Sequence, residues 1–160
     1  MVKASLKQLS DLQHAYACER TRVPPQYVVR TKYTDTTANG LTRCVTDWLI
    51  FNGHRADRIS SAGRYIDESK IVTDIMGHRK KIGSGKYIKS QTSNGYADIN
   101  ATIFGFSVMI EVKMKDKMSE AQIKFAEAER KAGGQYWVSH NFDEFLTDYN
   151  SFIKNKSLNL

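Results

Sequence analysis

The stretch GYADINATIFGFSVMIEVK, from Gly95 to Lys113, decides the fold that we predict for the second half of this chain. Two runs rich in β-branched and aromatic residues lie on either side of Gly105, which is typical of two strands joined by a tight turn. With Gly105 and Phe106 as the turn residues, Phe104 pairs with Ser107. We therefore predict a β-hairpin whose side chains alternate between two faces.

This predicted register places Asp98 opposite Lys113 and Asn100 opposite Glu111, with all four side chains on one face. Asp98 and Glu111 then become diagonal neighbours about 5–8 Å apart, a separation that suits two carboxylates binding one divalent cation. The alternative is an exposed ion pair between Asp98 and Lys113, worth less than about 1 kcal/mol, with Glu111 in solvent. The other face carries apolar side chains that a helix could cover: Val108, Ile110 and Val112.

Hydrophobic periodicity places further elements around this hairpin. Helices are predicted over 5–19, 41–53, 119–132 and 142–153. Strands are predicted over 27–33, 54–60 and 135–139, and a short helix or strand over 70–76. One face of the third helix is expected to consist of Ala121, Phe125, Ala128 and Ala132. The prediction is an α/β fold, a mixed sheet flanked by helices, in one domain over 1–160, with a helical N-terminal extension of about 1–36 and a core of about 37–153.

Composition fits a globular domain, with 41% hydrophobic and 26% charged residues among 160. The net charge of +7 points first to a polyanionic partner, usually nucleic acid, and the alternative is a basic surface that only keeps the protein in solution. Neither a signal peptide nor a membrane-spanning run is evident, so we expect a cytoplasmic protein with no membrane partner. Cys18 and Cys44 lie far apart and the four histidines lack metal-ligand spacing, so neither a disulfide, a structural zinc nor an organic cofactor is expected.

The most concentrated positive charge lies in HRKKIGSGKYIK, residues 78–89, and no acidic residue occurs between Asp74 and Asp98. One interpretation is a solvated loop. The other is a flexible basic arm that contacts phosphates, which release counterions when they are neutralised. The candidate contacts to the DNA backbone are Arg79, Lys80, Lys81, Lys86 and Lys89.

The charged residues of the predicted hairpin follow a known pattern. Asp98, followed in the next strand by Glu111-Val112-Lys113, resembles the D…ExK signature of the PD-(D/E)xK nuclease superfamily. The surrounding segments GYADI, IEVK, SEAQ and AGGQY fall in the order seen in the VRR-NUC (virus-type replication-repair nuclease) family. The resemblance covers about Gly95 to Phe145, with a looser continuation back to the 41–53 helix.

This resemblance implies a restriction-endonuclease-like core and a set of site residues. Asp98 and Glu111 would be ligands of Mg²⁺ or Mn²⁺, together with the backbone carbonyl of Val112. Lys113 would be the catalytic lysine, and Gln122 would lie near the active site at the start of a helix. A local interpretation of Gln122 exists as well, because Ser119-x-x-Gln122 matches a capping box.

The chain departs from the family at one position. The family carries a glutamate on its N-terminal helix, but the matching helix here, residues 39–52, contains no glutamate. Asp47 is the only acid of this helix, and Asn39 lies nearer its expected start. Either side chain could replace the glutamate, and the alternatives are a changed metal site or an impaired enzyme.

The function implied is that of a divalent-metal-dependent endonuclease that hydrolyses DNA phosphodiester bonds. Small members of the family resemble dimeric, structure-selective enzymes that act on branched DNA such as Holliday junctions or flaps. This would place a homodimer in the replication, recombination or repair of phage or mobile-element DNA, within the bacterial or phage-infected host cytoplasm. The alternatives are a non-catalytic DNA-binding recombination accessory protein on the same fold, or an RNA-processing nuclease.

Overall fold

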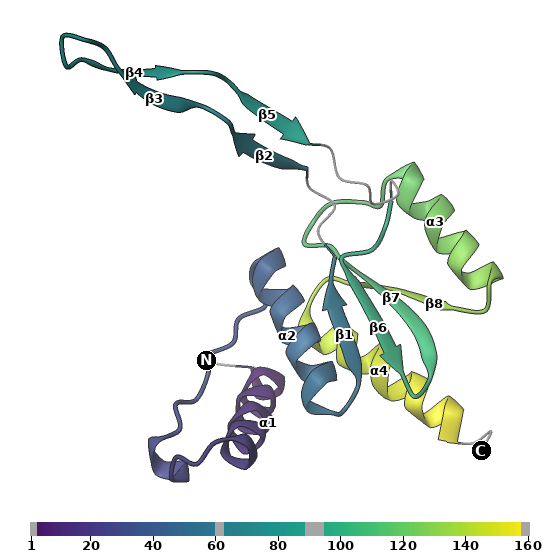
Figure 1. Ribbon diagram of the computed structural model, residues 1–160. Helices are drawn as coiled ribbons and strands as arrows, with labels where there is room; N and C mark the ends of the chain where they lie inside the picture. The colour runs from purple at the N-terminus through teal and green to yellow at the C-terminus, as the bar shows by residue number, and fades with distance from the viewer. Residues whose placement is uncertain (1–2, 60–62, 89–94, 158–160) are drawn as a thin grey trace. The chain divides into compact units, whose positions relative to one another are not determined.

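The computed structural model describes three parts of the chain: residues 3–59, 63–88 and 95–157 (Figure 1). Contacts within the chain define a larger compact unit, Met1–Ile59 with Gly95–Leu160, and a smaller one, Ser60–Asn94. The two units are described separately below, and the single nuclease domain over 1–160 stays a prediction.

A four-stranded mixed sheet forms the centre of the larger unit. In spatial order its strands are β1 (Arg55–Arg58), β6 (Ile99–Ile103), β7 (Phe106–Val112) and β8 (Gln135–Ser139). The first three pair antiparallel, whereas β8 runs parallel to β7 because helix α3 (Glu120–Lys131) carries the chain back between them. The prediction of a mixed sheet flanked by helices is confirmed.

Helices cover both faces of this sheet (Figure 1). On one face lie α1 (Ala4–Arg20), α2 (Ala38–Phe51) and α4 (Phe142–Ser157), whose apolar side chains form one core with β6, β7 and β1. This core contains the three predicted side chains of β7, Val108, Ile110 and Val112. The prediction that helices cover this face of the hairpin is therefore confirmed.

The opposite face of the sheet carries a smaller core under α3. Met109 of β7 and Tyr136 of β8 pack there against Ala126 of the helix. The predicted apolar face of α3 is partly wrong, because Ala128 and Ala132 are exposed. Alanine methyl groups mark a helix face only weakly, and the contact with Met109 and Tyr136 selects Ala126 instead.

The ends of the helices follow local signals in the sequence. The Thr37 side chain accepts a hydrogen bond from the Gly40 N–H at 3.1 Å and caps α2. Asn52-Gly53 ends that helix with Gly53 at φ +80°, as predicted. Ser119 caps α3, which stops before Gly133 at φ +91°.

The segment 27–33 does not form the predicted strand. It follows a short 3₁₀ turn, η1 (Pro25–Tyr27), and continues without regular structure. The reason is visible at Thr31, whose carbonyl accepts from the Ser10 hydroxyl at 2.8 Å and whose N–H donates to Gln13 at 3.0 Å. Side chains of α1 therefore satisfy backbone groups that a neighbouring strand would otherwise pair.

Buried Asp35 fastens the N-terminal segment to the start of α4. Its carboxylate accepts hydrogen bonds from the Lys3 ammonium at 2.8 Å and from the Phe142 N–H at 3.2 Å. Desolvation opposes ionisation, but these hydrogen bonds outweigh it and hold the pKa of Asp35 below its ordinary value. The ionised carboxylate therefore stabilises the folded state.

The smaller unit is one long antiparallel hairpin. Its strands pair as β2 (Arg64–Asp67) with β5 (Gly85–Ile88), and as β3 (Lys70–Thr73) with β4 (Arg79–Ile82). Asp67 pairs with Gly85 and, three residues further along each strand, Lys70 pairs with Ile82. The two ladders thus share one register, and Figure 1 shows them end to end. We call residues 63–88 the basic hairpin.

Of the two interpretations of residues 78–89, the solvated loop is wrong for the described part, which contains two strands, and the contact with phosphates stays a prediction. The lysines and glycines of this segment are typical of loops, but the segment pairs with residues 64–73, which the sequence pattern did not single out as its partner. The segment 70–76, predicted as a short helix or strand, is a strand over its first four residues. Among the described residues, no helix is long and apolar enough to span a membrane.

We predict that Asp35→Asn lowers the free energy of unfolding at pH 7 by about 1–3 kcal/mol, because a buried charge-assisted contact is lost. The folded-state pKa of Asp35 lies below its unfolded value, so its contribution is present above about pH 4 and disappears as the pH falls through the folded-state pKa. Urea unfolding at pH 7 and in acid measures this difference, with exposed Asp116→Asn as the control. An equal loss at both pH values would contradict the prediction.

Candidate active site

The turn of the central hairpin fixes which residues face each other. Phe104 and Gly105 are its two central residues, with φ +50° and +82°, and Ile103 pairs with Phe106 on either side. Two positive φ angles are typical of the type I′ turn, which matches the twist of the strands. The predicted turn at Gly105-Phe106 is therefore wrong by one residue, because the glycine takes the second turn position. Phe104 takes the first, and its ring lies 4.7 Å from that of His54.

This turn changes the register but keeps the face. Ile99 pairs with Ile110, so one residue further out Asp98 lies opposite Glu111, and the predicted pairing of Asp98 with Lys113 is wrong. The shift on the second strand is two residues, and side chains alternate with a period of two. Asp98, Glu111 and Lys113 therefore still share one face of the hairpin. We call these three residues, together with Gln122, the carboxylate site.

Glu111 is the most deeply buried member of the carboxylate site, with 2% of its surface exposed. The Gln122 amide donates to its carboxylate at 2.5 Å, the Lys113 ammonium lies 3.1 Å away, and the Tyr136 hydroxyl 3.5 Å. Burial and then the charge of Asp98 raise the pKa of Glu111, although Lys113 opposes the shift. The carboxylate thus has negative charge that these donors do not fully compensate.

Asp98 is half-buried at the entrance to β6. One oxygen of its carboxylate accepts the Val112 N–H at 3.0 Å, and its backbone carbonyl accepts the Ile59 N–H at 2.7 Å. Gly95 helps to position this segment, since it has φ +83° and lies against the backbone of Ala121. A side chain at Gly95 would collide with the first turn of α3, where Gln122 lies.

Gln122 combines the two roles that the sequence left open. Its side-chain oxygen accepts the Ser119 N–H at 2.9 Å, while the Ser119 hydroxyl accepts the Gln122 N–H at 3.3 Å, which makes a complete capping box. The amide nitrogen of the same side chain donates to Glu111. The cap therefore orients Gln122 toward the carboxylate.

Lys113 pairs with Glu111 rather than Asp98, so the alternative of an exposed ion pair between Asp98 and Lys113 is not the arrangement found. The Lys113 side chain is 15% exposed and that of Glu111 3%. A salt bridge this far buried carries a desolvation cost that its attraction only partly offsets. Such a pair is a weak source of stability, and its placement calls for another explanation.

The two candidates to replace the family's helix glutamate are engaged elsewhere. Asp47 accepts from the Tyr33 hydroxyl at 2.7 Å and lies 3.5 Å from the Arg43 guanidinium. Asn39 accepts from Arg58 at 2.6 Å. Over residues 3–59, 63–88 and 95–157, no group of three or more His, Cys, Asp or Glu side chains is arranged to hold a metal ion.

One acidic residue on the face of the carboxylate site was not predicted from the sequence. Asp57 of β1 pairs with Asn100, which places it on this face and diagonal to Asp98. It is exposed and lies 2.8 Å from Arg55. The alternation in the strand Arg55–Arg58, where Ala56 alone is buried, is the signal that could have identified it.

The predicted DNA-contact residues fall in the basic hairpin. Arg79, Lys80 and Lys81 lie on β4 and Lys86 on β5, all of them exposed, whereas Lys89 lies outside the described residues. Lys81 donates to Asp67 at 2.7 Å and lowers the pKa of that carboxyl. The hairpin thus brings four of the five residues together on one structural element.

Comparison of the chain with protein-family models, curated proteins and solved structures finds no match. The interpretation of the carboxylate site therefore depends on its own geometry.

We predict that Glu111→Gln stabilises the metal-free protein at pH 8, with a Tm increase of about 2–4 °C, equivalent to about 1 kcal/mol. The pKa of Glu111 is raised on folding from its ordinary 4.5, so its favourable contribution exists below that pH and is lost as the pH rises through the folded-state pKa. The difference should be clear at pH 8 and vanish in acid.

Scanning calorimetry in EDTA measures this difference, and Glu127→Gln on the exposed side of α3 is the matched control. A lower Tm of Glu111→Gln at pH 8 would show that the pair with Lys113 stabilises the fold, contrary to our expectation.

Proposed function

We propose that the chain is a divalent-metal-dependent endonuclease with a PD-(D/E)xK core, similar to the VRR-NUC family, that hydrolyses phosphodiester bonds of DNA. One observation carries the proposal: Asp98 and Glu111 face each other across neighbouring strands, and the buried Glu111 is held by Lys113 and Gln122. Burying a carboxylate opposite another carboxylate is unfavourable for a purely structural residue. A buried carboxylate whose pKa is shifted and that has a specific charge partner is typical of functional sites.

The donor set of the carboxylate site fits Mg²⁺ or Mn²⁺. Asp98 and Glu111 offer hard oxygen ligands, and the backbone carbonyl of Val112 would add a third. Burial and the nearby charge of Asp98 raise the pKa of Glu111, and a divalent cation bound by the two carboxylates would favour their ionised forms. When bound, such an ion supplies a water of lowered pKa and neutralises charge on the phosphate.

The remaining residues of the carboxylate site have distinct parts in the proposal. Lys113 carries a positive charge on the face shared by Asp98 and Glu111, where it would contact the scissile phosphate and stabilise its developing charge. Gln122 is a positioning residue, since its contact is with the Glu111 carboxylate. Its capping box holds the amide in place for that contact.

DNA is the proposed partner because of charge. The chain has a net charge of +7, and four candidate phosphate contacts lie on the exposed basic hairpin: Arg79, Lys80, Lys81 and Lys86. Contacts of this kind position DNA without reading its sequence. We propose action on branched DNA in the replication, recombination or repair of phage or mobile-element DNA. A homodimer would allow two strands to be cut symmetrically.

A second candidate function is that of a non-catalytic DNA-binding accessory protein on the same fold. The observation that favours it is the engagement of Asp47 and Asn39 with Tyr33, Arg43 and Arg58. This candidate requires binding without cleavage on every branched substrate and with every divalent metal.

The first test is cleavage of duplex, single-stranded, flap, splayed-arm and four-way-junction DNA in Mg²⁺ or Mn²⁺. We expect Asp98→Asn, Glu111→Gln and Lys113→Met each to reduce cleavage at least about a thousandfold, or ~4 kcal/mol in activation free energy, because the first two remove the charge of a proposed metal ligand and the third removes the cation at the reacting phosphate. DNA affinity should stay within about threefold of the wild type.

Full cleavage by any of the three variants would contradict the proposal. Binding by the wild type without cleavage would support the accessory function instead, and faster cleavage of RNA than of DNA would indicate an RNA-processing enzyme.

A second prediction separates the two roles of Gln122. Gln122→Ala removes the side-chain half of the capping box and the contact with Glu111 but keeps the Ser119 hydroxyl cap, and should lower cleavage by about 10- to 100-fold while raising the Mn²⁺ concentration needed for half-maximal rate. Ser119→Ala removes the cap hydroxyl alone, so it should cost about 1 kcal/mol of stability without changing the Mn²⁺ requirement.

The matched readouts are urea unfolding and Mn²⁺ titration of the cleavage rate. An equal change in Mn²⁺ requirement for both variants would show that Gln122 acts through the helix cap alone.

A further inference from the structure

The turn at the end of the basic hairpin presents two apolar side chains to solvent. Ile75 is fully exposed and Met76 is 77% exposed. None of the described residues 63–88 is buried, so these side chains are not the edge of a local core. Single exposed apolar residues are ordinary on protein surfaces, but a pair at the apex of a hairpin turn is placed for contact.

The turn is held rigid by its own hydrogen bonds. The Asp74 carboxylate accepts the backbone N–H groups of Met76 and His78, both at 2.9 Å. The backbone of Asp74 makes two more hydrogen bonds in the turn, each at 3.0 Å. Its N–H donates to the His78 carbonyl, and its carbonyl accepts from the Gly77 N–H. Gly77 has the φ of +84° that closes the loop. The backbone that carries Ile75 and Met76 is therefore held in place by contacts within the turn itself.

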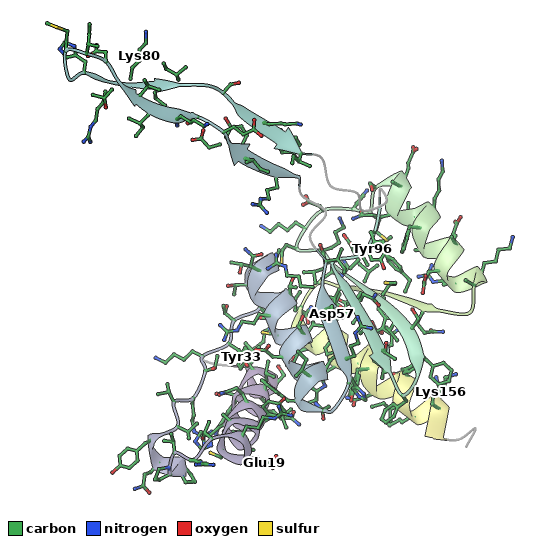
Figure 2. The ribbon with its side chains drawn as sticks, viewed as in Figure 1. Glu19, Tyr33, Asp57, Lys80, Tyr96 and Lys156 are labelled. Carbon is green, nitrogen blue, oxygen red and sulfur yellow. The ribbon has the colours of Figure 1, made fainter. Side chains whose placement is uncertain are left out.

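The strands behind this turn carry positive charge on both faces. One face shows Lys70 and Lys80 with Val72 and Ile82, and the other shows Arg79 and Lys81 with Ile71 and Thr73. Figure 2 labels Lys80 on the strand next to the turn. A partner lying on one side, such as a flat surface, would meet only one of these faces. A nucleic-acid groove has phosphates along both walls and meets both faces.

We propose that the basic hairpin enters the minor groove of DNA and that Ile75 and Met76 insert as a wedge at a base step. Apolar side chains, Ile and Met among them, are used by minor-groove proteins to separate stacked bases. The proposal rests on the proposed function for its choice of DNA as partner, and it gives that function a source of selectivity. Separating an intact step costs free energy, whereas the bases at a branch point are already partly unstacked. The wedge therefore favours branched over continuous duplex DNA.

The test uses Ile75→Ser/Met76→Ser in a Glu111→Gln background, so that cleavage does not disturb the binding measurement. The full chain is mixed with a flap and with a continuous duplex of equal length, each carrying 2-aminopurine at the branch or central step. The parent protein should increase 2-aminopurine fluorescence on the flap and bind it about tenfold more tightly than the duplex. The double variant should lose the fluorescence increase and most of this preference, with an unchanged Tm because both side chains are exposed.

Two control variants separate the wedge from general effects. Val29→Ser removes an apolar side chain that is 83% exposed in the larger unit, and should change neither fluorescence nor preference. Lys80→Ala should weaken binding to both DNAs alike and reduce the salt slope by about 1, as expected for one phosphate contact.

Retention of the fluorescence increase and the preference by the double variant would overturn the wedge and leave the nuclease proposal intact. An equal loss of affinity for flap and duplex would also overturn it. A change from dimer to monomer in the double variant would overturn the wedge as well. Binding of the wild type to vesicles of anionic phospholipid but not to DNA would also overturn it. Conversely, a wild-type protein that opens the flap without cleaving any DNA would support the wedge and contradict the nuclease.

Discussion

The register of β6 against β7 determines what the candidate active site can be. The positive φ angles of Phe104 and Gly105 make a two-residue turn, and from it each residue of one strand is assigned a partner on the next. A slip of one residue would send Asp98 and Glu111 to opposite faces of the sheet. The Glu111 side chain would then point into the apolar core under α1, α2 and α4. The contact of Gly95 with the first turn of α3 then brings Gln122 within reach of Glu111.

The charge balance around Glu111 gives this geometry a chemical meaning. One ammonium and two neutral donors surround the carboxylate, yet burial and Asp98 still raise its pKa. A site optimised for stability would have replaced the carboxylate by an apolar or amide side chain. The buried carboxylate therefore costs stability, as is common at residues that serve a function, because function and stability make opposite demands on such residues.

Much of the larger unit follows from sequence periodicity, while the details that set the site depend on tertiary context. The face shared by Asp98 and Glu111 was predictable because the error in the turn moved the register by an even number of residues. The position of Gly105 within the turn could not be predicted, because glycine suits either of the two turn positions. The segment 27–33 has β-propensity but no pairing strand, since side chains of α1 satisfy Thr31. The two roles of Gln122 share one side chain, and no pattern in the sequence could separate them.

The basic hairpin must be stabilised without a core of its own. An isolated two-stranded hairpin is marginal in water. Here local contacts take the place of a core: Tyr65 pairs with Tyr87 across the strands, each ring lies against a glycine of the opposite strand, and Lys81 binds Asp67. These contacts fix the strands but leave the apolar turn and the basic side chains exposed. An exposed and positively charged element of this kind adds little to the free energy of folding and is suited to binding. The chain thus combines a buried carboxylate site, whose residues the fold constrains, with a basic hairpin in which none of the described residues is buried.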